Sequence, residues 1–228
     1  MSSFSSFLTI TLIFGVAPVL IFYLSRFVTR TALTTANTPQ YLPRITPVLL
    51  ATWYISAVIV GYYIKSPLSP AGLIQIVIPM LLGILIIFLA KSATRLLEKM
   101  PPQWLIGLQV YRSAGFLFLY LYFHDNFISR GFALSAGTGD LLVGLSALPI
   151  AAWVRSARKG YMAAAIIWNI AGITDLVLAP VSARTAGFQG ITSYPLVVVP
   201  LFLGPPLGIV LHLASLRNLH LRFRTNKS

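Results

Sequence analysis

Three charged residues lie inside long apolar stretches of this sequence, and they are the residues best placed to do chemistry. Arg112, Asp140 and Asp175 each interrupt a different apolar run that is long enough to cross a membrane. A lone Arg or Asp at the centre of a membrane helix costs about 2.5–3.5 kcal/mol on insertion scales. We therefore expect the guanidinium of Arg112 to pair with Asp140, Asp175 or both.

Neutral polar residues accompany these charges. Gln109 precedes Arg112 by three residues, so the two share one face of a helix. Asn169 lies in the same apolar run as Asp175, and Trp168 shares a helical stripe with that aspartate. We expect Gln109 and Asn169 to complete the hydrogen bonds of the charged cluster.

The cluster has two interpretations. Ionisable residues inside membranes often mark a ligand or ion site, so Arg112 would hold an anionic group or act as counter-ion, while Asp140 or Asp175 binds a cation or carries a proton. The partner would then be a small polar or anionic ligand or a proton. Alternatively, the protein is a structural, accessory or sensory membrane protein in which the charges only fix helix packing.

Metal and haem chemistry have little support in the sequence. The chain has no cysteine, and its histidines, His124, His212 and His220, are not placed to sandwich a haem or to form a metal site with the carboxylates. We expect no cofactor. His212 lies within the last apolar run and is a secondary site candidate, although a single histidine there is more typical of helix packing.

Composition predicts the elements that must position these residues. Of the 228 residues, 57% are hydrophobic and 9% are charged, against about 25% charged in a soluble domain. This excludes a soluble globular or disordered protein and predicts an all-α, polytopic integral membrane protein, a single bundle of seven transmembrane helices. The expected spans are about 7–24, 47–64, 72–90, 104–123, 132–154, 161–180 and 194–216.

The distribution of basic residues predicts the orientation. Of the 17 Lys and Arg residues, 13 flank the spans on one side, Arg112 is intramembrane, and the other side has only Lys65, Arg130 and Arg184. The positive-inside rule then places the N-terminus outside and the C-terminus in the cytoplasm. We expect a multi-pass protein of the plasma membrane, most compatible with a bacterial inner membrane. The net charge of +13 is thus explained by the basic residues that set the orientation in the membrane. We therefore expect the lipid bilayer, and not nucleic acid, as the partner. The sequence leaves the oligomeric state open.

Prolines mark the last span as irregular. Pro200, Pro205 and Pro206 lie within it and are expected to kink or break the helix. Broken membrane helices often line a cavity, which favours a pocket beside this span.

One short motif adds a third interpretation. Gly137-Thr138-Gly139-Asp140 resembles the GxGD motif of intramembrane aspartyl proteases, in which two membrane-embedded aspartates share catalysis. The resemblance implies an intramembrane hydrolase with Asp175 as the second aspartate. It covers four residues, and the Pro-Ala-Leu motif of the presenilin-like branch is missing.

Overall fold

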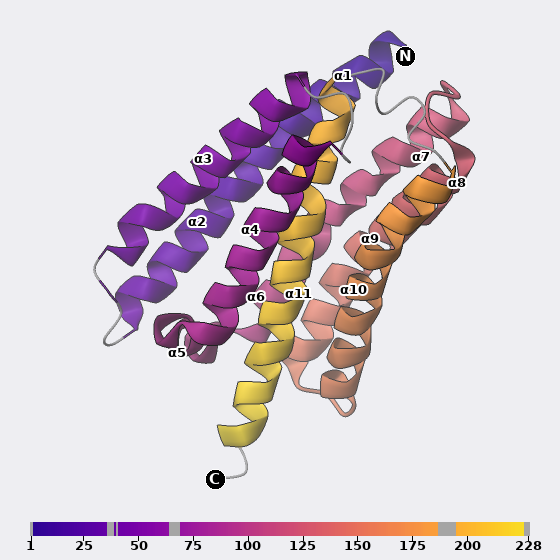
Figure 1. The fold of residues 1–228 in the computed structure, drawn as a ribbon. Coiled ribbons are helices and arrows are strands. Elements are labelled where there is room, and N and C mark those ends of the chain that lie inside the picture. The colour runs from indigo at the N-terminus through magenta and orange to yellow at the C-terminus, as the bar shows by residue number, and fades with distance from the viewer. Residues whose placement is uncertain (1, 36–38, 40, 64–68, 187–194, 226–228) are drawn as a thin grey trace.

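The computed structural model describes residues 2–35, 39, 41–63, 69–186 and 195–225. Every regular element among them is a helix, and the long helices run side by side as a bundle (Figure 1). Within these residues, seven helices are long and apolar enough to cross a membrane. The all-helical class and the expectation of seven span-length helices are therefore confirmed. These seven are Ser3–Thr34, Pro43–Tyr63, Pro70–Leu89, Pro102–Phe123, Arg130–Ser156, Tyr161–Ser182 and Val199–Arg224.

Several spans are built from more than one element. The first, fourth and fifth spans each contain a turn of π or 3-10 helix, whereas the third is regular throughout. In chain order the elements are α1 (Ser3–Thr11), η1 (Leu12–Val16), α2 (Ala17–Thr34), α3 (Leu42–Tyr63), α4 (Pro70–Leu89), α5 (Lys91–Lys99), α6 (Pro102–Gly107), η2 (Leu108–Gly115), α7 (Phe116–Phe123), α8 (Arg130–Phe132), η3 (Ala133–Gly137), α9 (Thr138–Ser156), α10 (Tyr161–Ala186), η5 (Pro195–Val198) and α11 (Val199–Thr225).

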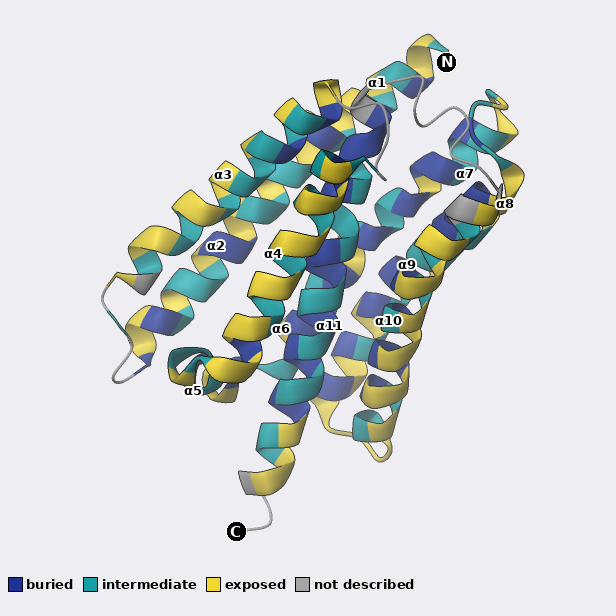
Figure 2. Cartoon of the chain, viewed as in Figure 1, coloured by how far each residue is buried: buried dark blue, intermediate teal, exposed yellow. Residues whose placement is uncertain are grey.

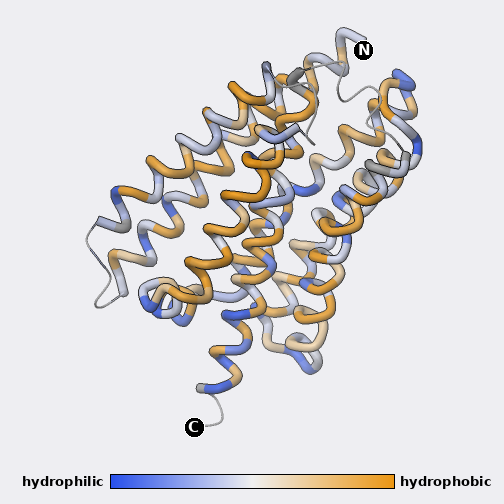
Figure 3. The backbone as a smooth tube through the Cα atoms, viewed as in Figure 1, coloured by the Kyte–Doolittle hydropathy of each residue, from blue (hydrophilic) through white to orange (hydrophobic). Residues whose placement is uncertain are grey.

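The bundle turns apolar side chains outward as well as inward. Exposed residues cover the outer faces of α3 and α4 (Figure 2), and the same faces are strongly hydrophobic (Figure 3). Leu81, Leu82 and Leu85 of α4, for example, are each about half exposed. An apolar surface that extends along two span-length helices is typical of contact with lipid.

The last span forms the centre of the bundle. Helix α11 packs against α3, α4, α6 and α10, and it carries the largest buried share of the seven spans. The fourth span, which contains Arg112, is the next most buried. The spans that carry the candidate site are therefore the ones most enclosed by protein.

The prolines were expected to kink or break the last span, and the expected break is wrong. Helix α11 continues through Pro205 and Pro206 and extends to Thr225, beyond the expected end near residue 216. His212 consequently lies near the middle of this helix. Proline removes a backbone donor, but membrane helices tolerate it where side chains of neighbouring helices bond to the surrounding carbonyls.

The basic residues used to assign the orientation are only partly described. Lys65 and Lys227 lie outside the described residues, as does the side chain of Arg184. The third span is followed by the short helix α5, which buries Leu96 and Leu97.

Candidate functional site

A turn of 3-10 helix places Arg112 in the interior. Element η2 occupies the middle of the fourth span, where α-helix would be expected. A 3-10 helix has three residues per turn, so positions three apart lie on the same side. Gln109, Arg112 and Gly115 follow this spacing, and all three are buried. The local winding therefore directs Arg112 toward α9, α10 and α11.

Arg112 forms ion pairs with both aspartates, as the sequence predicts. Its Nε lies 2.6 Å from Oδ1 of Asp140, and its Nη2 pairs with Oδ2 of Asp175. The arginine side chain is 1% exposed, whereas the Asp140 and Asp175 side chains are 22% and 19% exposed. The guanidinium is thus enclosed, while both carboxylates retain an accessible edge.

The remaining edge of the guanidinium contacts the last two spans. Nη1 donates to the Gly172 carbonyl at 3.2 Å and lies 3.1 Å from Nε2 of His212. A guanidinium only donates, so Nε2 must accept, and Nδ1 then carries the proton that is donated to Oδ1 of Asn169 at 2.9 Å. Asn169 in turn donates to Ser215. His212 is therefore a neutral member of the charged network and not a separate packing residue.

Three of the predicted residues do not bind Arg112 directly. Gln109 donates to the Gly208 carbonyl at 3.0 Å, so the expectation that it completes the hydrogen bonds of Arg112 is wrong. Asn169 reaches Arg112 only through His212. Trp168 donates its indole N–H to Ser146, and its ring lies 5.1 Å from the imidazole of His212.

Two glycines allow the helices to meet at the cluster. A Cβ atom on Gly139 would overlap the Asp175 carboxyl group, and a Cβ on Gly172 would overlap the His212 ring. Both positions therefore need a residue without a side chain. The second glycine of the Gly-Thr-Gly-Asp sequence has this steric role: it lets Asp175 approach Arg112.

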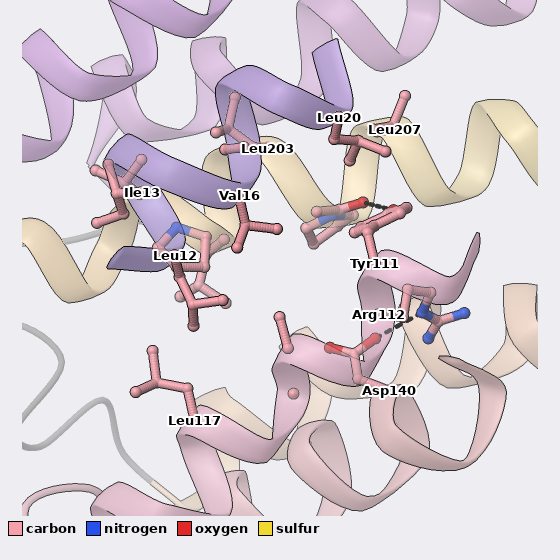
Figure 4. Close-up of a pocket in the computed structure, with 18 of the residues that line it drawn as sticks. Leu12, Ile13, Val16, Leu20, Tyr111, Arg112, Leu117, Asp140, Leu203 and Leu207 are labelled. Atoms are coloured by element: carbon pink, nitrogen blue, oxygen red, sulfur yellow. Dashed lines mark hydrogen bonds and ion pairs between the residues drawn. The ribbon is translucent and has the colours of Figure 1, made fainter. Parts of the chain in front are cut away.

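A cavity of about 120 Å³ reaches the cluster from the side of the first span. Arg112 and Asp140 lie in its wall, and most of the other lining is apolar. Figure 4 shows one oxygen of Asp140 bonded to Arg112 and the other turned toward the cavity, with Val16 projecting into the same space. The cavity is also lined by Leu12, Ile13, Leu20, Trp53, Tyr111, Leu117 and residues of α11.

The first span and α3 thus contribute to the site, although their sequences contain no intramembrane charge. Leu12 and Val16 lie at the ends of the π-helical turn η1. Single apolar residues in an apolar span carry no signal that would distinguish a cavity wall from a lipid-facing surface.

A second polar cluster, here called the N-terminal clamp, joins the start of the chain to the α7–α8 connection. It consists of Ser2, Ser5, His124 and Asp125. The Ser2 amide donates to Asp125, and His124 Nδ1 lies 2.9 Å from the same carboxylate. Burial raises the pKa of Asp125, but hydrogen bonds from Ser5, His124 and Ser2 outweigh it and leave the pKa below its usual range.

The geometry of the two membrane aspartates differs from the arrangement that the protease resemblance implies. The guanidinium of Arg112 lies between Asp140 and Asp175 and bonds to both. An aspartyl dyad shares one proton between two carboxyl groups. Here the carboxylates share an arginine, so the structure lends no support to the hydrolase interpretation.

Comparisons with known proteins place the chain in a family. No curated protein and no solved structure matches it. One family model, described as a domain of unknown function (DUF8737), matches residues 70–220. This range is more than half of the chain, and it includes Arg112, both aspartates and His212 but not the first two spans. The chain therefore belongs to the family described as a domain of unknown function, DUF8737.

Proposed function

We propose that this protein binds a small ligand or ion within the membrane, as a transporter does, at the site formed by Arg112, Asp140 and Asp175. The observation that carries the proposal is the cavity that reaches Asp140 in a cluster of two carboxylates and one guanidinium. With both aspartates ionised, the cluster has one negative charge in excess. An uncompensated charge at this depth is costly, so the site favours a proton or a cation.

The bonding of Arg112 favours a cation over an anion. A guanidinium has five N–H donors, and four hydrogen bonds already connect this one to Asp140, Gly172, His212 and Asp175. One N–H is left, and the Arg112 side chain is 1% exposed. An anion bound through two N–H groups would therefore have to displace one of these partners. Arg112 is therefore better suited to be the counter-ion that holds the two carboxylates in place than to be the ligand-binding group.

The membrane context belongs to the same proposal. We place the seven spans in a plasma membrane of bacterial type with the N-terminus outside, because Lys and Arg are concentrated in alternate connections. The cavity beside Asp140 then lies within the membrane, in its outer half. Arg112 lies at the middle of its span, Pro102–Phe123.

The test compares Asp140→Asn and Asp175→Asn with Asp125→Asn, which alters a carboxylate outside the spans. Thermal unfolding of the purified protein in nanodiscs would be measured with added monovalent cations and at pH values above 3.8, where Asp125 does not make the stability depend on pH. Because a ligand that binds only the folded state stabilises it, the wild type and Asp125→Asn should gain stability on binding a proton or cation. Both membrane variants should lose that gain.

The alternative, a structural or sensory protein with locked charges, is favoured by the 1% exposure of the Arg112 side chain. It predicts that neither pH nor any cation changes the stability of the wild type beyond the change seen in Asp140→Asn. That result would refute the ligand proposal.

A further inference from the structure

We infer that the ligand is a lipophilic monocation, an ammonium group with a single alkyl chain, and that it enters the site from the bilayer. This inference rests on the proposed function and names the chemical class of the ligand. It derives from three features of the cavity: its charge, its aromatic lining and the wall that it shares with a groove on the membrane-facing surface.

The cavity combines one carboxylate with aromatic rings. Arg112 and Asp140 both line it and Asp175 does not. The guanidinium of Arg112 is already bonded to four partners, so the free oxygen of Asp140 is the charged atom that faces the ligand (Figure 4). Trp53 and Tyr111 line the same cavity, and the Tyr111 hydroxyl is bonded to the Gly204 carbonyl at 2.9 Å, which fixes the orientation of the ring. Aromatic faces beside a negative charge are the common means of binding ammonium groups, through cation–π attraction.

The size of the cavity limits what can fill it. Its volume of about 120 Å³ is close to that of an engineered cavity, about 150 Å³, that holds one benzene molecule. The space therefore admits a compact head group and excludes a long chain. The rest of an amphiphilic ligand must lie elsewhere.

A groove of about 1170 Å³ provides that place. It runs between the first span and the fourth, and its lining is predominantly apolar. The cavity and the groove share several wall residues, so these side chains separate one space from the other. The shared residues are Leu12, Val16, Leu20, Tyr111, Ala114 and Leu117.

The packing of the first span explains why the groove is open. Helix α2 packs chiefly against α3, and α1 contacts α7 near the end of the bundle where the N-terminal clamp lies. Val16, in η1 between these contacts, is 43% exposed and projects into the cavity (Figure 4). The head group can thus pass Val16 while the alkyl chain remains in the groove.

The experiment uses the full chain in phosphatidylcholine nanodiscs and radiolabelled decyltrimethylammonium, with empty nanodiscs to subtract partitioning into lipid. Saturable binding is expected, with competition by unlabelled probe but not by decanol, which has the same chain and no charge. Asp140→Asn and Trp53→Leu should each weaken binding about tenfold or more.

A second pair of variants leaves the charges intact, so the test holds even if Asp140→Asn fails to fold. Val16→Trp should block the passage and reduce binding. Ile10→Trp, similarly exposed on the same span but outside the cavity and groove, should bind as the wild type does. Equal competition by decanol, or unchanged binding in Val16→Trp and Trp53→Leu, would overturn the inference.

The outcomes separate this inference from the proposed function. If the probe does not bind but protons or small cations still stabilise the wild type and not Asp140→Asn, the lipophilic ligand is refuted and the ion site stands. If neither the probe nor any ion stabilises the wild type, both proposals fail.

Discussion

Replacing Arg112 with glutamine should destabilise the protein strongly, because it leaves two carboxylates together without their counter-ion. Removing one partner of a buried ion pair costs about 3–5 kcal/mol, whereas exposed pairs contribute less than about 1 kcal/mol. The Arg112 side chain is 1% exposed, but the two aspartates are about one-fifth exposed and keep some solvation. We therefore expect Arg112→Gln to lower the free energy of unfolding by about 3 kcal/mol.

The measurement is equilibrium unfolding in mixed micelles of increasing dodecyl sulfate content, followed by the helical circular dichroism signal. A triple variant, Arg112→Gln with Asp140→Asn and Asp175→Asn, carries the same truncation at position 112 as the single variant and has side chains of nearly the original size at positions 140 and 175, but it has no charge. It should recover at least half of the lost stability, because the uncompensated charges are the main cost. Arg112→Lys should fall between, since an ammonium retains the charge but not the planar fork of donors.

Two results would refute this account. A loss below about 1 kcal/mol in Arg112→Gln would mean that the pairs behave as exposed ones. A triple variant no more stable than the single variant would mean that packing or hydrogen bonding, and not charge, accounts for the loss.

Three further perturbations test other parts of the structure. Gly139→Ala should lower the free energy of unfolding by about 1–3 kcal/mol, because the added methyl group would overlap Asp175. Gly204→Ala is the control: the space around its Cβ position is open, so the free energy of unfolding should change by less than about 0.5 kcal/mol in the same assay. Asn218 donates to two carbonyls at the end of α5, one of them Met100 at 2.9 Å, so Asn218→Ala should cost about 1–2 kcal/mol and increase amide hydrogen exchange in α5 while leaving α4 protected. The pKa of Asp125 is lower in the folded protein than its ordinary value of 3.8, so the N-terminal clamp is fully stabilising above pH 3.8 and weakens as the pH falls below that value. Amide hydrogen exchange of α1 should therefore rise on acidification in the wild type. The Asp125→Asn variant should lose this pH dependence.

The ligand-binding and packing interpretations make different predictions for the two membrane aspartates. If the charges only lock the bundle, Asp140→Asn and Asp175→Asn should have similar effects, since each carboxylate bonds to the same guanidinium. If the cavity binds a ligand, Asp140→Asn should have the larger effect on binding, because Asp140 lines the cavity. This asymmetry comes from the structure and could not be expected from the sequence.

The sequence by itself determined the class of the protein, its seven span-length helices and the pairing of Arg112 with the two aspartates. The reason is energetic: hydrocarbon requires about twenty apolar residues per helix, and charges buried on neighbouring spans have to compensate one another. Both requirements depend on residue type and approximate position, which can be read along the chain.

Only the tertiary structure decided which neutral residues complete the site. The 3-10 turn η2 changes the angle between successive side chains, and Gln109 bonds to the last span instead of the charged cluster. His212 joins the network because α11 continues past Pro205 and Pro206 and brings its ring to Arg112. The cavity wall contains Val16 and Trp53 because the first span contacts α7 and α3 packs against α11. Helix rotation and the choice of neighbouring spans depend on packing over the whole bundle, and a local sequence pattern does not encode them.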